Sequence, residues 1–183
     1  MATRAVSAPL AQLPNALTIL RLALIPVFVV VYAASDDGSS WAAGWIFLVA
    51  GVTDQVDGFL ARRWDVESRF GRLADPLADR LMIDAAVILL WLEGKLPWPG
   101  ALVIVLRDLI LVGGYRLLMP KGVEVSVSRL GKLATWILYL AVGILTVVGH
   151  DTTWPLWLFW IGLGLALVAA AQYVVAARRE VAE

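Results

Sequence analysis

The sequence predicts an all-α integral membrane protein with six transmembrane helices. The first observation is its composition, since 61% of the 183 residues are hydrophobic, only 16% are charged, and the mean hydropathy is +0.81. A soluble domain of this size rarely has such a composition. The second observation is a series of apolar segments, each near the roughly 20 residues that a helix needs to cross a hydrocarbon core. These segments are 17–34, 41–61, 72–92, 98–118, 130–149 and 154–177.

The connections between the six segments are short, which predicts one domain over residues 1–183. No low-complexity stretch, repeat or Pro/Gly/Ser linker interrupts them. Tryptophans near the predicted helix ends indicate an interfacial aromatic belt. They are Trp41, Trp45, Trp91, Trp98, Trp154 and Trp157.

The distribution of Lys and Arg predicts the orientation in the membrane. The loops after the first, third and fifth segments contain a single basic residue, Lys95, and the other side collects most of the remaining ones. Basic loops stay in the cytoplasm, so we expect both termini there, in a multi-pass protein of the cell membrane. The stretch "LALIPVFVVVYA" resembles the apolar part of a signal peptide, but about twenty residues precede it, which is too long for a leader.

Four aspartates at the cytoplasmic ends of the second and third segments form the first candidate site. Asp54 and Asp57 are three residues apart and Asp75 and Asp79 four apart, so each pair shares a helix face. The chain contains no cysteine, and clustered carboxylates suit Mg²⁺ or Mn²⁺. Intramembrane carboxylates also line the ion pathways of transporters, and Asp75 before Pro76 could be a helix cap.

Residues between the two aspartate pairs favour a phosphate ligand. Gly58 and Gly71 lack side chains, so the backbone can approach a ligand closely at these positions. Arg62 offers a forked cation to phosphate oxygens. Together with a metal, these residues suggest a diphosphate.

The same stretch resembles the complete signature of the CDP-alcohol phosphatidyltransferase family. Its eight specified positions, at the family's spacing, are Asp54, Asp57, Gly58, Ala61, Arg62, Gly71, Asp75 and Asp79. The opening "PNALTILR" also resembles the start of bacterial members, through Pro14, Asn15, Thr18 and Arg21. The length and the six spans agree with the family along almost the whole chain.

This resemblance implies transfer of a phosphatidyl group from CDP-diacylglycerol to an alcohol, with release of CMP. It implies two divalent cations, Mg²⁺ or Mn²⁺, bound by Asp54, Asp57 and Asp75. Asp79 would be the base that activates the acceptor hydroxyl, and could also touch the second metal. The CDP group would be bound by Gly58, Ala61, Arg62, Gly71, Thr18 and Arg21. A homodimer in contact with membrane lipids is expected, and no nucleic acid partner.

The acceptor alcohol is predicted from basic residues near the fourth and fifth segments, which favour an acceptor that carries a phosphate. They are Arg107, Arg116, Lys121, Arg129 and Lys132. Phosphatidylglycerophosphate synthases usually have Arg-Glu where this chain has Arg107-Asp108. With "GKLAT" at the start of the fifth segment, this pair favours phosphatidylglycerol as acceptor and hence a cardiolipin synthase. The alternative is glycerol 3-phosphate, and a prenyltransferase or an ion transporter is a more distant possibility.

Four further polar residues in the apolar segments, and the single histidine, receive separate predictions. Arg80 and Asp84 are four residues apart and are expected to form a buried ion pair. Arg107 and Asp108 are adjacent and are expected not to face each other on a helix. His150, the only histidine, is predicted on the far side of the membrane and is not expected to bind a ligand.

Overall fold

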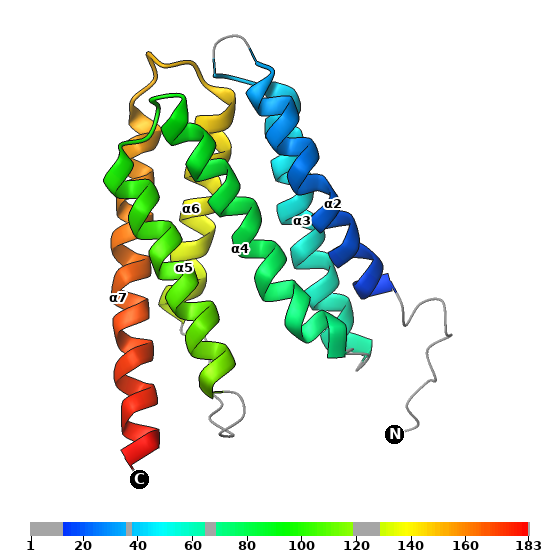
Figure 1. Ribbon diagram of the computed structural model, residues 1–183, viewed down its shortest axis with the longest axis vertical. Coiled ribbons are helices and arrows are strands. Elements are labelled where there is room, and N and C mark those ends of the chain that lie inside the picture. The colour runs from blue at the N-terminus through cyan, green and yellow to red at the C-terminus, as the bar shows by residue number, and fades with distance from the viewer. Residues whose placement is uncertain (1–12, 36–37, 65–68, 119–128, 183) are drawn as a thin grey trace.

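The computed structural model describes residues 13–35, 38–64, 69–118 and 129–182 (Figure 1). Side chains at 13–14, 54–64, 69–77, 79, 114–118, 173–174 and 176–182 lie outside this description. The described part of the chain forms six helices and no strand. They are α2 (Leu13–Ala33), α3 (Trp41–Trp64), α4 (Arg69–Leu92), α5 (Trp98–Leu118), α6 (Arg129–Val147) and α7 (Trp154–Ala182). The predicted all-α fold is therefore confirmed.

Three stretches of the described residues are long and apolar enough to cross a membrane by themselves. They are Asn15–Ala33, Arg129–Val147 and Trp154–Gln172. Over the residues whose side chains are described, α3 contributes a shorter apolar stretch, Trp41–Thr53, and the signature begins directly after it. This agrees with an integral membrane protein whose central helices also carry polar groups.

The helices run alternately up and down, so that the start of α2 and the end of α7 lie at the same end of the bundle (Figure 1). The loops after α2, α4 and α6 lie at the opposite end. Helix α2 packs on α3, α6 packs on α7, and α4 contacts α2, α3, α5 and α6. Helix α4 is therefore central, and its polar residues can meet groups from several helices.

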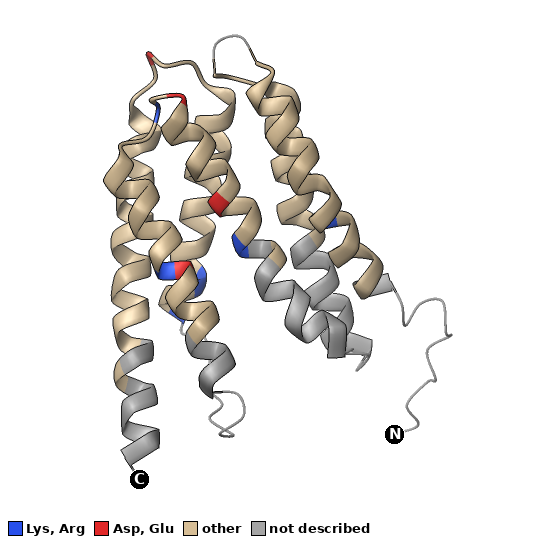
Figure 2. Ribbon diagram, viewed as in Figure 1, with Lys and Arg blue, Asp and Glu red and all other residues tan. Residues whose placement is uncertain are grey.

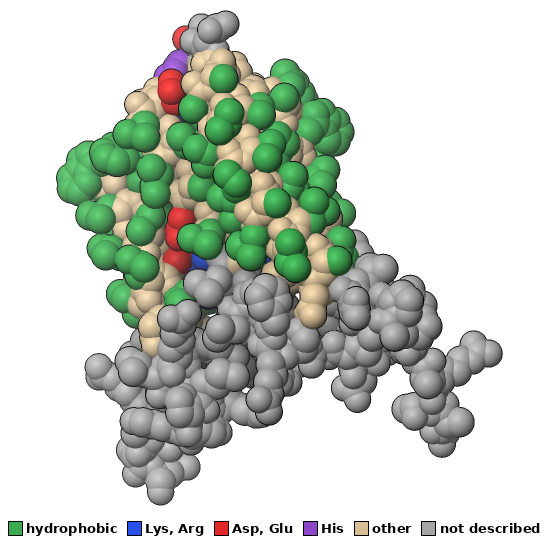
Figure 3. Space-filling model, turned by 45° about the vertical axis from the view of Figure 1, so that its right-hand side comes forward, with side chains coloured by type: hydrophobic (Ala, Val, Ile, Leu, Met, Phe, Trp, Pro, Cys, Tyr) green, Lys and Arg blue, Asp and Glu red, His purple; other side chains and the backbone are tan. Residues whose placement is uncertain are grey.

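Aromatic rings and small aliphatic side chains fill the core between α2, α3 and α6. The ring of Phe28 lies 5.9 Å from those of both Tyr32 and Phe47, and Phe47 lies 5.1 Å from Tyr139. The Tyr32 hydroxyl donates a hydrogen bond to the carbonyl oxygen of Gly38 at 2.6 Å. Large hydrophobic side chains cover the outside (Figure 3), as expected for a surface in contact with lipid.

Glycines allow close approach at several helix contacts. A Cβ at Gly44 of α3 would collide with Val147 Cγ2 of α6. A Cβ at Gly100 of α5 would lie 2.9 Å from Phe159 Cε1 of α7. Small residues at helix contacts are typical of membrane bundles, because association there depends on close van der Waals packing.

The end of the bundle opposite the termini carries the tryptophan belt that the sequence predicts. Each of these side chains is exposed, between 44% for Trp91 and 73% for Trp157. They come from the beginnings of α3, α5 and α7 and from the end of α4. Exposed indole rings near the ends of these helices suit a membrane–water interface.

Candidate active site

The four signature aspartates lie on two consecutive antiparallel helices, α3 and α4, which contact each other. At a rise of 1.5 Å per residue, Asp57 and Asp75 are both roughly 10 Å from the loop that joins the helices. Asp54 and Asp79 are both about 15 Å from it. In Figure 1 these halves of α3 and α4 converge. The backbone therefore brings the two pairs to matching depths, while their side chains lie outside the described residues.

Oxygen donors at matching depths on two neighbouring helices suit hard divalent cations, which prefer carboxylates. The backbone arrangement fits such a site. Elsewhere among the described residues, no group of three or more His, Cys, Asp or Glu side chains could hold a metal.

Helix α2 contributes two buried polar side chains near the same end of the bundle. Thr18 is 1% exposed and Arg21 is fully buried, and they lie on one face because they are three residues apart. An arginine inside a membrane bundle is costly unless nearby groups compensate its charge. Helix α2 packs on both α3 and α4, so these residues lie beside the helices that carry the aspartates.

The other predicted site residues fall into three groups. Gly58, Ala61, Arg62 and Gly71 lie on α3 and α4, and Arg116 lies on α5, but their side chains lie outside the described residues. Lys121 lies in a segment, 119–128, that is also outside them. Arg129 and Lys132 are exposed near the start of α6, at the same end of the bundle as the termini (Figure 1).

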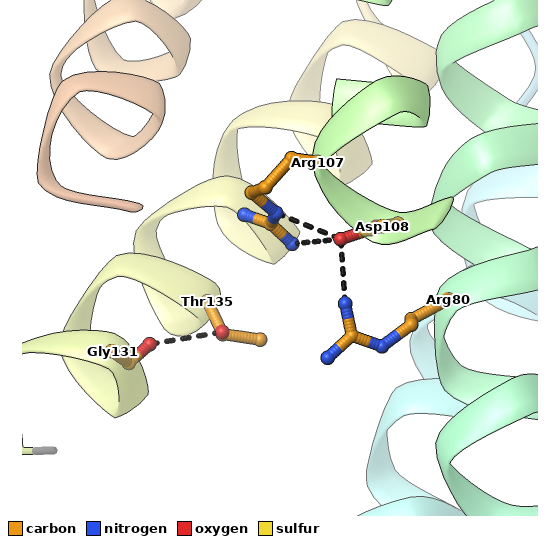
Figure 4. Close-up of polar contacts among 5 residues, drawn as sticks. All are labelled: Arg80, Arg107, Asp108, Gly131 and Thr135. Atoms are coloured by element: carbon orange, nitrogen blue, oxygen red, sulfur yellow. Dashed lines mark hydrogen bonds and ion pairs between the residues drawn. The ribbon is translucent and has the colours of Figure 1, made fainter. Parts of the chain in front are cut away.

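A cluster of charged side chains links α4 to α5 (Figure 2), and its member on α4, Arg80, directly follows Asp79 in the chain. Asp108 of α5 is 2% exposed. Its Oδ1 accepts hydrogen bonds from Arg80 Nη1, at 2.7 Å, and from Arg107 Nε, also at 2.7 Å. Arg107 Nη2 lies 2.7 Å from the same oxygen (Figure 4). One carboxylate oxygen thus holds two guanidinium groups from two helices.

This cluster corrects the prediction that Arg80 pairs with Asp84. Arg80 instead reaches across to Asp108 on α5, and Asp84 Oδ1 is buried without a hydrogen-bond partner. Spacing along one helix shows which side chains share a face, but the contact between α4 and α5 supplies a nearer carboxylate. Asp84 remains close enough to interact electrostatically with Asp108, Arg107 and Arg80.

The prediction that Arg107 and Asp108 do not face each other is also wrong. Adjacent Cβ atoms do point in different directions on a helix. However, the long Arg107 side chain folds back, so that Nε and Nη2 both reach Asp108 Oδ1 (Figure 4). The spacing rule holds for the backbone but fails for a side chain of this length.

The sequence reasoning missed the central role of Asp108 in this cluster. A usable signal was present, since four charged residues interrupt two apolar segments at positions 80, 84, 107 and 108. Intramembrane charges are rarely left unpaired. Their number therefore indicated a network between the two helices, although the partners could not be assigned from the sequence.

The cluster is partly accessible from one side of the bundle. Side-chain exposure is 29% for Arg80 and 10% for Arg107. In Figure 3, charged side chains are visible at mid-height between ridges of hydrophobic ones. Thr135 of α6 lies on the side of that helix turned toward the guanidinium groups, with its hydroxyl donating to the Gly131 carbonyl at 3.0 Å (Figure 4). Both residues belong to the "GKLAT" stretch.

Comparison with known proteins identifies the family. The model of the CDP-alcohol phosphatidyltransferase family matches residues 11–178, almost the whole chain. The chain belongs to the CDP-alcohol phosphatidyltransferase family. It is therefore a membrane enzyme of phospholipid biosynthesis that transfers a phosphatidyl group, as the resemblance in the signature implies.

Curated relatives cover nearly the full length of this phosphatidyltransferase. The Bacillus subtilis CDP-diacylglycerol–glycerol-3-phosphate 3-phosphatidyltransferase is 31% identical over 88% of this chain and 93% of its own. The Escherichia coli protein of the same name is 35% identical over 92% and 96%. The Rickettsia felis protein, also of that name, is 29% identical over 92% and 96%.

These names count against the acceptor favoured by the sequence. Arg107-Asp108 and "GKLAT" favour phosphatidylglycerol, but these relatives are named for glycerol 3-phosphate. The replacement of Glu by Asp removes one methylene and keeps the carboxylate. It is therefore a weak guide to the acceptor in this family.

Proposed function

We propose that this phosphatidyltransferase uses glycerol 3-phosphate as its acceptor. The acceptor hydroxyl attacks the phosphorus that carries diacylglycerol, the bond from that phosphorus to the bridging oxygen breaks, and CMP leaves. The products are phosphatidylglycerophosphate and CMP. The observation that carries the proposal is the name shared by relatives that match nearly the whole chain.

The charged cluster between α4 and α5 supports an acceptor with a phosphate group. Arg107 and Arg80 place two guanidinium groups on one buried carboxylate oxygen, and Arg80 directly follows Asp79 on α4. Guanidinium groups bind phosphate through paired N–H donors. With Arg107 in the acceptor site, the acceptor hydroxyl would lie toward the aspartates. We include Arg116, Lys121, Arg129 and Lys132 in the same proposal, as cations that attract the acceptor from the cytoplasm.

At the diphosphate of CDP-diacylglycerol, where the reaction takes place, we propose that two divalent cations, Mg²⁺ or Mn²⁺, are bound. Their ligands would be Asp54, Asp57, Asp75 and Asp79. Bound there, the cations would polarise the diphosphate of CDP-diacylglycerol and stabilise the negative charge of departing CMP. Asp79 takes the proton of the acceptor hydroxyl. Thr18, Arg21, Gly58, Ala61, Arg62 and Gly71 form the CDP site.

This site lies at the end of the bundle where α2 begins and α7 ends (Figure 1), which we propose is cytoplasmic. The support is the distribution of Lys and Arg between the two sides. The aspartates are then about 10–15 Å from the end of their helices. A lipid substrate could reach them laterally while its CDP group and glycerol 3-phosphate arrive from water. The homodimer implied by the family stays a prediction, which light scattering of the purified enzyme would test.

A competition assay tests the acceptor. Purified enzyme in detergent receives CDP-diacylglycerol, Mg²⁺ or Mn²⁺, and equal amounts of glycerol 3-phosphate and phosphatidylglycerol. We expect phosphatidylglycerophosphate and CMP in equal amounts, separated by lipid and nucleotide chromatography. Cardiolipin as the main product would contradict the proposal.

A further inference from the structure

Asp108 is a single carboxylate at the junction of α4 and α5, and its two oxygens have unequal surroundings. Oδ1 receives the N–H groups of both arginines. Oδ2 is buried without a hydrogen-bond partner. The two guanidinium groups therefore supply the hydrogen bonds that orient this side chain, and it orients them in return.

The contacts with Asp108 use only one edge of each guanidinium group. Arg107 binds through Nε and Nη2, and the third nitrogen points away from Asp108 (Figure 4). Arg80 binds through Nη1. The remaining N–H groups of both arginines have no hydrogen-bond partner that the described residues provide. Two sets of donors are thus held in fixed positions and remain available to an anion.

Charge explains why a carboxylate is needed at this point. Two guanidinium groups repel each other, and the repulsion is stronger in a bundle that excludes water. Asp108 compensates them from the buried side, because it is 2% exposed while Arg80 is 29% exposed. The carboxyl of Asp84 also interacts with both guanidinium groups. Arg80 is more exposed than Arg107 and Asp108, so a phosphate would approach from the side of Arg80.

We propose that Asp108 is a positioning residue for the acceptor, a proposal that rests on the proposed use of glycerol 3-phosphate. It holds the guanidinium groups of Arg107 and Arg80 together, so that their remaining N–H groups bind the acceptor phosphate. Asp108 does not itself touch the acceptor. Its loss therefore weakens acceptor binding and leaves the binding of CDP-diacylglycerol largely intact.

The test compares Asp108→Asn and Asp108→Glu with the unchanged enzyme, purified in detergent. Asp108→Asn keeps the shape but removes the charge, and we expect the KM for glycerol 3-phosphate to rise about tenfold or more. The KM for CDP-diacylglycerol should change by less than about twofold. Asp108→Glu retains the carboxylate and should recover most of the affinity. Asp151→Asn, in the exposed loop after α6, is the matched control and should leave both KM values unchanged.

A second measurement does not depend on turnover. Glycerol 3-phosphate should raise the unfolding temperature of the unchanged enzyme, and Asp108→Asn should need about tenfold more of it for the same rise. Glycerol, which lacks the phosphate, should have no effect on either protein. If Asp108→Asn cannot be purified in folded form, Arg80→Gln replaces it, because it removes one of the two guanidinium groups, and the same rise in KM is expected.

The outcomes separate the two proposals. An unchanged enzyme that consumes glycerol 3-phosphate, with no change in its KM on Asp108→Asn or Arg80→Gln, would overturn the positioning role alone. Equal increases in both KM values with a lower unfolding temperature would also overturn it, since they indicate a purely structural role. An unchanged enzyme that ignores glycerol 3-phosphate would overturn the proposed function and this inference with it.

Discussion

The amino group of Lys95, in the loop between α4 and α5, donates hydrogen bonds to the carbonyl oxygen of Val148 just beyond α6, at 2.5 Å. It also donates to the Leu145 carbonyl at 3.1 Å. The last carbonyls of a helix have no partner within the helix, so this lysine caps α6 from another part of the chain. Burial lowers the pKa of Lys95, and the nearby carboxylate of Glu93 acts in the opposite direction.

Lys95→Met should destabilise the protein, because it leaves the two carbonyl oxygens without this donor. The expected loss is about 1–3 kcal/mol in the free energy of unfolding, measured in detergent by thermal or denaturant unfolding. Lys132→Met makes the same change at an exposed lysine of α6 and should cost less than about 0.5 kcal/mol. Equal stability of the two variants would show that the cap contributes nothing.

Gly44 and Gly164 should respond oppositely to alanine. A Cβ at Gly44 would collide with Val147 Cγ2, whereas a Cβ at Gly164 would meet no atom within 4 Å. Gly44→Ala should therefore cost about 1–3 kcal/mol through overpacking between α3 and α6. Gly164→Ala should be neutral or stabilise by up to about 1 kcal/mol, because alanine favours helix. The two melting temperatures check this, and a lower value for Gly164→Ala than for Gly44→Ala would contradict the packing.

Removal of divalent cations should abolish transfer. Enzyme dialysed against EDTA should release no CMP from CDP-diacylglycerol, and Mg²⁺ or Mn²⁺ should restore the rate. Cations at about 100 times their Kd should also stabilise the folded enzyme by about 2.7 kcal/mol, seen as a rise in melting temperature. Full activity in EDTA would remove the metal site from the mechanism.

Asp57→Asn should lower the rate by about 100-fold or more, since losing a metal ligand removes several kcal/mol of charge stabilisation. The neutral amide keeps the shape, so the variant should still insert and fold. Its melting temperature should no longer rise with Mg²⁺. Asp151→Asn, a carboxylate at the far end of the bundle, should retain both the activity and the metal-dependent rise. Near-normal activity of Asp57→Asn would contradict its assignment as a ligand.

Much of the fold could be predicted from the sequence because lipid imposes a minimum length on each apolar segment. The segment 98–118 coincides with α5, and 17–34 differs from α2 by four residues at its start and one at its end. The depth of the aspartates could also be predicted, because two helices joined by a short turn must be antiparallel. These features depend on positions within one helix or across one turn.

The charged cluster could not be predicted because its contacts join distant parts of the chain. Arg80 and Asp108 are 28 residues apart, and their contact depends on how α4 packs against α5. Helical spacing instead favoured Asp84, which lies on the same helix as Arg80. The predicted acceptor, which the names of the relatives count against, depends on Asp108 as a family marker, whereas the structure shows its contacts with two arginines.

Asp79→Asn should separate proton transfer from substrate binding. If Asp79 takes the acceptor proton, the amide removes the base and kcat should fall about 100-fold or more. The KM for CDP-diacylglycerol should change far less, because the proton moves only during transfer.

A catalytic base also affects the pH profile of the reaction, since the rate rises as the base loses its proton. The unchanged enzyme should show this acidic limb, and the residual activity of Asp79→Asn should lack it. Steady-state rates across pH and CDP-diacylglycerol concentration provide both readings. A parallel loss of kcat and of affinity for CDP-diacylglycerol, with the acidic limb retained, would instead make Asp79 mainly a metal ligand, since the same carboxylate can bind the second ion.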